Sequence, residues 1–179
     1  MRAHHDACYV GTFSKTLLPA LHIAYLVLPP DLVEIFRSAK FLSDWAAPIF
    51  EQHALAGFLE SGNFERHLRR ARTLYAKSRA ALVEAIDREL SDFAPSYCDS
   101  RAGLHLLLRF GALEGGDLTS LISAGRVGGV GLYPSRPCSL EGAPRELELV
   151  MGFSRLAPNA IRDGVGKLRS LLSDHRMRR

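Results

Sequence analysis

Thr12-Phe13-Ser14-Lys15 lies between two short apolar runs, and these runs decide the fold expected for this part of the chain. Cys8-Tyr9-Val10-Gly11 precedes the lysine, and Ile23-Ala24-Tyr25-Leu26-Val27-Leu28 follows it and ends at Pro29-Pro30. Both runs hold β-branched and aromatic side chains, carry no charge and are bounded by turn residues. They predict two short buried strands, joined through a turn that holds Lys15.

A lysine held between buried strands has a distinctive chemistry. Desolvation disfavours the charged amine, so the pKa of Lys15 is expected to lie below its ordinary value of about 10.4. A neutral amine is a nucleophile that condenses with aldehydes. The hydroxyls of Thr12, Ser14 and Thr16, with nearby backbone N–H groups, can face an anion. The alternative is an ordinary surface turn, because Lys15 is one of four lysines and most lysines are solvated.

Composition limits the class of protein. A chain of 179 residues with 47% hydrophobic and 23% charged residues can bury at least one core, and it has no tract typical of disorder. Its three cysteines, Cys8, Cys98 and Cys138, are odd in number and widely spaced, which argues against a disulfide framework or a zinc site and fits a reducing cytoplasm. The longest apolar run, residues 23–30, is too short to span a bilayer.

The net charge of +4 raises the question of nucleic-acid binding. The densest basic cluster runs from Arg66 to Arg79, on a stretch with helical periodicity that also has acids nearby at Glu60 and Glu65. A solvated helix face explains such a cluster better than a polyanion site does. A small basic nucleic-acid binder stays open as the weakest alternative.

The rest of the chain alternates helical and extended patterns. Asp31 is expected to cap a helix over residues 32–42, and further helices are expected over 48–59, 63–90, 117–123 and from Pro158 onward. Apolar runs predict strands over residues 103–110, 127–133 and 146–153. Strands that alternate with helices predict an α/β layer.

The lysine segment resembles a known one. Tyr9 to Leu21 (YVGTFSKTLLPAL), continuing through residues 23–29, resembles the cofactor-lysine segment of the fold-type-I pyridoxal-phosphate aminotransferases (class I/II), and most closely that of the MocR-type regulators of the GntR family. Four later segments resemble the same group in the same order: residues 61–70, 102–106, 129–134 and 152–156. The resemblance therefore extends over most of the chain.

The resemblance implies a fold and a division into parts. Residues 1–62 would be a remnant of the large cofactor-binding domain, carrying the Schiff-base lysine. Residues 63–179 would be the connecting helix and the small C-terminal α/β domain. Family members carry a DNA-binding winged helix and the start of the large domain ahead of this point, so the chain resembles a C-terminal fragment without a DNA-binding domain.

The resemblance also implies site residues and partners. Lys15 would be the catalytic residue, forming the internal aldimine with pyridoxal 5'-phosphate in the intact protein, and Thr12, Ser14, Lys15 and His22 would bind the cofactor. The family usually has arginine where this chain has His22, and an imidazole is only partly charged at neutral pH. Neither the resemblance nor the spacing indicates a metal site. An amine or amino acid would be the effector or substrate, and the intact protein would be a cytoplasmic homodimer without membrane association.

Val150 departs from the aminotransferase pattern, in which an arginine at this point binds the substrate carboxylate. Two hypotheses follow. The chain is part of a catalytic or amine-sensing aminotransferase-like domain, or it is a non-catalytic remnant that acts only as a folding or dimerisation module. The isolated chain is expected to be inactive in either case.

Overall fold

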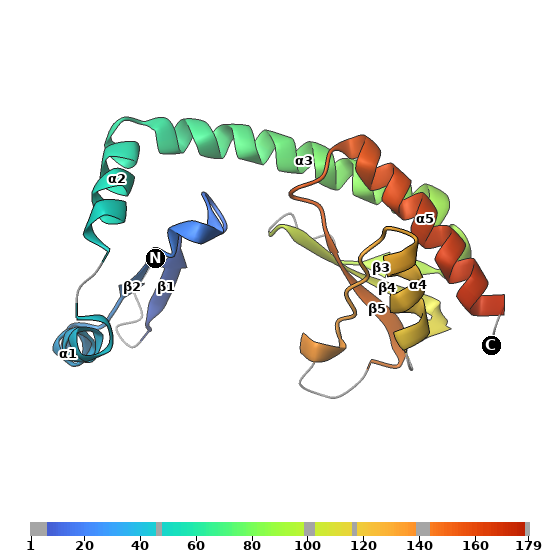
Figure 1. Ribbon diagram of the computed structural model, residues 1–179, viewed down its shortest axis with the longest axis horizontal. Helices are drawn as coiled ribbons and strands as arrows, with labels where there is room; N and C mark the ends of the chain where they lie inside the picture. The colour runs from blue at the N-terminus through green and yellow to red at the C-terminus, as the bar shows by residue number, and fades with distance from the viewer. Residues whose placement is uncertain (1–6, 46–47, 99–102, 116–117, 139–143, 178–179) are drawn as a thin grey trace. The chain divides into compact units, whose positions relative to one another are not determined.

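The computed structural model describes residues 7–45, 48–98, 103–115, 118–138 and 144–177 (Figure 1). The chain forms two compact units, Met1–Arg70 and Ala71–Arg179. The domain boundary expected between residues 62 and 63 stays a prediction. Within the described residues, no helix is both long and apolar enough to cross a membrane.

The first unit contains a two-stranded antiparallel sheet. Strand β1 (Tyr9–Thr12) pairs with β2 (Ala24–Val27), in a register that sets Tyr9 opposite Val27 and Thr12 opposite Ala24. The short 3₁₀ helix η1 (Pro19–Leu21) lies in the loop between the strands. The two strands expected on either side of Lys15 are therefore confirmed as strands.

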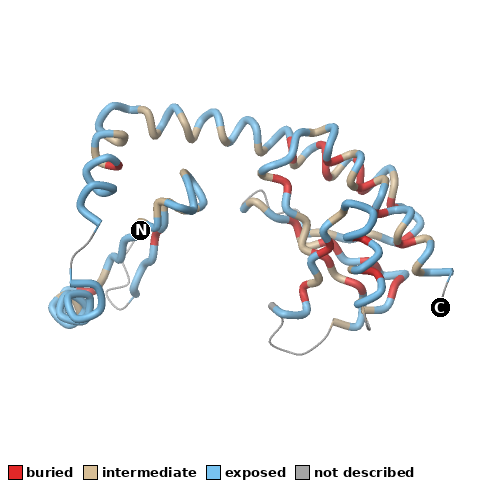
Figure 2. Tube along the Cα trace, in the orientation of Figure 1, coloured by how far each residue is buried: buried red, intermediate tan, exposed pale blue. Residues whose placement is uncertain are grey.

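The burial expected for these strands is wrong. Gly11 is the only buried residue in β1, and all four residues of β2 are exposed. Among the described residues, β1 and β2 pair only with each other, and a two-stranded ribbon has no flanking strands to cover it. Figure 2 shows how few positions of the first unit are buried; those described as buried are Gly11, Pro29 and Leu55.

Two helices complete the first unit. A 3₁₀ turn, η2 (Pro30–Leu32), leads into α1 (Val33–Asp44), and α2 (Ile49–Glu60) follows. The expected capping role of Asp31 is wrong, because Asp31 lies within η2 and Leu32 occupies the cap position of α1 without a side-chain hydrogen bond. The end of α2 is as expected, since Gly62 follows it with a φ of 69° that glycine adopts without strain.

The second unit is built on a three-stranded antiparallel sheet in the order β3-β4-β5. Its strands are β3 (Pro95–Tyr97), β4 (His105–Glu114) and β5 (Glu146–Gly152). Burial alternates along β4, where Leu106, Leu108 and Phe110 are buried, and along β5, where Leu147 and Leu149 are buried. This alternation is typical of a sheet with one face on a core.

Three helices contribute to the core of the second unit. They are α3 (Asn63–Glu89), whose C-terminal half carries the buried residues, α4 (Thr119–Val127) and α5 (Pro158–Met177). The helix expected from Pro158 onward is confirmed as α5, and Ile161, Val165, Leu168 and Leu172 on it are all buried. Arg162 on α5 pairs with Glu84 on α3 at 3.3 Å, so the two helices lie against each other. Two short 3₁₀ turns, η3 (Ser91–Phe93) and η4 (Arg136–Cys138), connect elements.

The strand expected over residues 127–133 is wrong. Val127 ends α4, and Gly129 continues the turn with a φ of 75°. The following residues are extended but join the sheet through a single bridge, between Pro134 and Leu149, and the N–H of Val150 donates to the carbonyl of Tyr133 at 2.8 Å. Glycine readily adopts the positive φ that ends a helix, so these residues form the end of α4 and a turn, although their apolar pattern favours a strand.

Candidate functional site

Lys15 lies on a single turn that begins where β1 ends. The N–H of Phe13 donates to the carbonyl of Ile23 at 3.1 Å, which extends the pairing of the two strands by one bond. The N–H of Leu17 then donates to the carbonyl of Phe13 at 2.8 Å, closing one helical turn over the intervening residues. Ser14, Lys15 and Thr16 therefore project from one tight turn.

The three hydroxyls near Lys15 have different roles. The Thr12 hydroxyl oxygen accepts the N–H of Ser14 at 3.1 Å and lies 3.5 Å from the carbonyl oxygen of Ile23. The Thr16 hydroxyl donates to the carbonyl of Phe13 at 3.3 Å. Both hydroxyls thus hold the turn. The Ser14 hydroxyl has no hydrogen bond to another described residue, so it remains able to bind a ligand.

Lys15 is exposed, so its expected burial between the strands is wrong. The reason is the exposed ribbon, which screens nothing from water. Within the described part of the chain, the amine forms no hydrogen bond or ion pair, so no carboxylate competes with a ligand for it. The lysine is therefore accessible.

His22 lies at the other end of the loop that contains Lys15. It has a left-handed backbone with a φ of 50°, and its N–H donates to the carbonyl of Pro19 at 3.3 Å, which ends η1. Its side chain is exposed. The structure thus places Ser14 and Lys15 on one turn directly after Thr12, the last residue of β1, and it places His22 two residues before the start of β2.

Aromatic rings and a distant histidine support the turn. The Phe13 ring lies 5.9 Å from the rings of both Tyr25 and Phe64. His67 forms a 2.8 Å hydrogen bond through Nε2 with the carbonyl oxygen of Thr16. The roles of Phe64 and His67 were not predicted, since they are about fifty residues from Lys15 and no local pattern points to the contact.

Gly11 lies beneath the ring of Tyr25. Tyr25 lies opposite Gly11 in the register, and a Cβ at this position would come within 2.2 Å of the ring. The hydrogen bond with Tyr9, followed by the electrostatic interaction with it and slight desolvation, raises the pKa of Tyr25 above its usual value. The ring of Tyr25 thus contacts the rings of both Tyr9 and Phe13.

The described cavities lie elsewhere in the chain. The larger has a volume of about 490 Å³ and the smaller about 270 Å³, and all their lining residues belong to the second unit. Among the residues that the structure describes, no group of three His, Cys, Asp or Glu side chains is placed to bind a metal ion.

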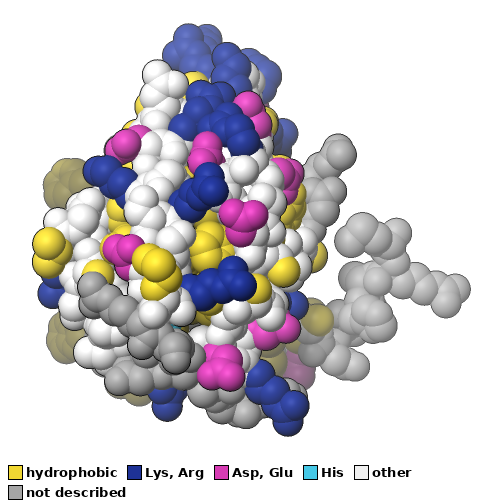
Figure 3. Space-filling view, turned by 90° about the vertical axis from the view of Figure 1, so that its right-hand side faces the viewer, with side chains coloured by type: hydrophobic (Ala, Val, Ile, Leu, Met, Phe, Trp, Pro, Cys, Tyr) yellow, Lys and Arg dark blue, Asp and Glu magenta, His cyan; other side chains and the backbone are white. Residues whose placement is uncertain are grey.

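Charge is mixed over the surface of the second unit. Arg169 pairs with Glu89 at 3.5 Å and with Asp92 at 3.4 Å, and Arg88 pairs with Glu89 at 2.9 Å. Figure 3 shows basic and acidic side chains side by side on one face. A nucleic-acid site needs a continuous basic patch, so this arrangement favours a solvated helix surface.

The donor set of the turn fits the chemistry of pyridoxal phosphate. An unpaired primary amine suits an aldehyde, and a free hydroxyl and an imidazole suit a phosphate. These groups are Lys15, Ser14 and His22, while Thr12 shapes the turn that presents them.

Comparison with known proteins gives sequence relatives. No protein-family model matches the chain. It is 38% identical over 164 residues to the HTH-type transcriptional regulator YhdI of Bacillus subtilis, across 90% of this chain and 34% of that protein. It is 34% identical over 163 residues to the probable rhizopine catabolism regulatory protein MocR of Rhizobium meliloti, across 90% of this chain and 32% of that one. The chain thus spans about a third of the length of these curated relatives.

A solved structure gives the fold. The chain matches the crystal structure of LysN, an alpha-aminoadipate aminotransferase from Thermus thermophilus complexed with N-(5'-phosphopyridoxyl)-L-leucine, with a TM-score of 0.80 and 26% identity. The match covers 93% of this chain and 42% of that chain. The expected fold class, an α/β fragment of the fold-type-I aminotransferase architecture, is confirmed.

Proposed function

We propose that this chain is part of a pyridoxal-phosphate-dependent, aminotransferase-like effector domain. Its homologues are MocR-type transcriptional regulators, and its fold is that of the fold-type-I aminotransferases. Lys15 is the residue proposed to bind the cofactor covalently. The observation that carries the proposal is the turn itself, which presents an unpaired amine beside a free hydroxyl.

Each residue of the turn has a defined part. Thr12 accepts the N–H of Ser14 and so stabilises the start of the turn. The Ser14 hydroxyl would donate to a phosphate oxygen of the cofactor, and the imidazole of His22 would add a second donor. Lys15 supplies the nucleophilic amine, and the same amine can carry a proton to or from a substrate carbon. The cofactor, when bound, supplies the electron sink.

The proposed role of Lys15 also implies a ligand and an oligomeric state for the intact protein. An amine or an amino acid is the proposed effector or substrate, and the intact protein is proposed to be a cytoplasmic homodimer. In a regulator, an effector acts by binding one arrangement of the protein more tightly than another, and that difference then changes affinity for DNA.

Reductive labelling tests the role of Lys15. The full chain is mixed with pyridoxal phosphate, reduced with borohydride and digested, and labelled lysines are located by peptide mass spectrometry. The label is expected on Lys15, with much weaker labelling by pyridoxal, which lacks the phosphate that Ser14 and His22 would bind. Lys15→Ala should abolish this label, while Lys40→Ala, which removes an exposed lysine of α1 paired with Asp44, should preserve it. Equal labelling of all four lysines, or equal labelling by pyridoxal, would contradict the proposal.

The exposed apolar surface of the first unit favours a second candidate function, a folding or dimerisation module without catalysis. Leu42, Trp45 and Phe50 are 78%, 81% and 89% exposed. Side chains of this size on a monomer surface mark an interaction site. Further exposed apolar residues of the same unit are Tyr9, Val10, Leu18, Tyr25, Leu26, Val27, Ile35, Phe36, Phe41 and Ile49.

Sedimentation of the full chain tests the second candidate. A dimer is expected that Phe50→Ser weakens, because a serine removes most of the apolar area of one anchor. Val127→Ser is the matched control, since Val127 is 90% exposed but lies in the second unit. A monomer at every concentration, or equal weakening by both variants, would exclude a dimerisation role for this surface.

A further inference from the structure

The first turn of α3 contacts the Lys15 turn at two points, both within the first unit. Phe64 and His67 are three residues apart, so they lie on the same face of α3. The Phe64 ring meets the Phe13 ring edge-on, at 5.9 Å between centroids and 66° between planes. His67 Nε2 lies 2.8 Å from the carbonyl oxygen of Thr16. The two contacts are thus made to residues on either side of Lys15.

The Lys15 turn gains order from such contacts because its own hydrogen bonding is sparse. One backbone bond closes it, from the N–H of Leu17 to the carbonyl of Phe13 at 2.8 Å. A single helical turn is unfavourable by itself, since several backbone angles are fixed for one hydrogen bond. The last carbonyls of a helical turn also have no partner within it, and the Thr16 carbonyl is one of them. His67 supplies the donor that this carbonyl lacks.

The chemistry of the contact defines which side chains can replace His67. A carbonyl oxygen only accepts hydrogen bonds, so Nε2 of His67 carries a hydrogen and donates it. Glutamine places an amide N–H donor at a similar distance from its Cα, whereas alanine has no donor. The His67 side chain is half-buried, which partly shields the bond from competing water.

We propose that His67 is a positioning residue for Lys15, with Phe64 in support. The bond to Thr16 keeps residues 13–17 in the closed turn, and the closed turn presents the Lys15 amine together with the Ser14 hydroxyl. One phosphate-bearing aldehyde can then engage both groups. The inference rests on the function proposed for Lys15, and it adds that selectivity for the phosphate depends on a side chain of α3.

Hydrogen exchange of the Leu17 amide, measured by NMR on the full chain, tests whether His67 holds the turn. His67→Ala is expected to speed this exchange roughly two- to tenfold, the range that corresponds to the net contribution of one hydrogen bond. His67→Gln should restore the slow rate. His53→Ala is the matched control, because His53 is an exposed histidine on α2 of the same unit, and it should leave the rate unchanged.

Reductive labelling of the same variants tests the positioning role. The measured quantity is the ratio of Lys15 labelling by pyridoxal phosphate to Lys15 labelling by pyridoxal. His67→Ala should lower this ratio roughly two- to tenfold, while labelling by pyridoxal stays unchanged because it needs only an accessible amine. His67→Gln should restore the ratio, and a merely structural role would not link the ratio to a donor at this position.

The inference is overturned if His67→Ala leaves either the Leu17 exchange rate or the labelling ratio unchanged, or if His67→Gln restores neither. A ratio of one in the unmodified chain would instead overturn the function proposed for Lys15, and the positioning role with it. The two failures are therefore distinguishable, since the first leaves the unmodified chain selective for the phosphate.

Discussion

Glu148 is expected to hold segment 133–135 against β5, and Glu148→Gln tests this role. Its carboxylate accepts one hydrogen bond from the Ser135 hydroxyl and one from Arg109 Nε, both at 2.6 Å. Ser135 is 8% exposed, so its bond is shielded from water, whereas the Arg109 side chain is 53% exposed. A hydrogen bond to a charged group contributes about 1.5–3 kcal/mol and a neutral one about half as much. An exposed ion pair contributes about 0–1 kcal/mol.

Replacing the carboxylate with an amide should therefore lower the free energy of unfolding by about 1–2 kcal/mol at neutral pH. The hydrogen bond from Ser135, with help from Arg109, lowers the pKa of Glu148 against an opposing desolvation. Because the folded pKa lies below the unfolded one, this stabilisation is complete above the unfolded pKa of about 4.3 and is lost as the pH falls through the folded pKa. The difference between the two proteins should shrink accordingly in acid.

Urea unfolding followed by far-ultraviolet circular dichroism measures this difference. Glu146→Gln is the matched control, because Glu146 is on the same strand and exposed, so its loss should change stability by less than about 0.5 kcal/mol. Equal stability of Glu148→Gln and the unmodified chain at neutral pH would refute the reasoning. A difference that persists unchanged at low pH would refute the electrostatic part alone.

Three further substitutions have definite expected outcomes. Phe110→Ala, at a fully buried position of β4, should lower the free energy of unfolding by about 3–5 kcal/mol, and a loss below about 1 kcal/mol in urea unfolding would contradict the assigned core. Gly164→Ala should raise the melting temperature, because the new methyl group meets no atom within 4 Å and glycine costs a helix about 0.5–1 kcal/mol; a lower melting temperature would show that the space is not free. Gly11→Val should displace the Tyr25 ring, which a Cβ would approach to 2.2 Å, and unchanged tyrosine ring signals in NMR spectra would argue against this contact.

Local patterns in the chain were enough to predict most helices. The ends of α2 and α3 and the buried stripe of α5 follow from spacing and turn residues, because each of these depends on neighbours within a few positions. The same holds for the turn that presents Lys15, whose internal hydrogen bonds join residues two to four apart.

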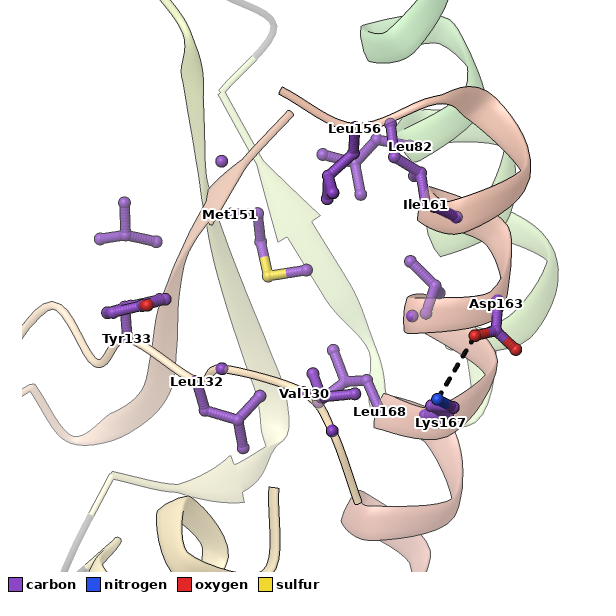
Figure 4. Close-up of a pocket in the computed structure, with 17 residues that line it drawn as sticks. Leu82, Val130, Leu132, Tyr133, Met151, Leu156, Ile161, Asp163, Lys167 and Leu168 are labelled. Atoms are coloured by element: carbon purple, nitrogen blue, oxygen red, sulfur yellow. Dashed lines mark ion pairs between the residues drawn. The ribbon is translucent and has the colours of Figure 1, made fainter. Parts of the chain in front are cut away.

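Tertiary contacts decided which segments are buried and which pair as strands, and the sequence patterns predicted some of these features wrongly. An apolar run is typical of a buried strand, but burial depends on partners, and β1 and β2 have only each other among the described residues. Segment 127–133 shows the same dependence, since its link to β5 rests on Pro134 and Tyr133 meeting a strand that follows much later in the sequence. The cavity of about 490 Å³ beside Lys167 (Figure 4) likewise exists only once four separate segments have packed. Short-range order can be read from adjacent residues, whereas exposure and enclosed space are set by chain segments that meet only on folding.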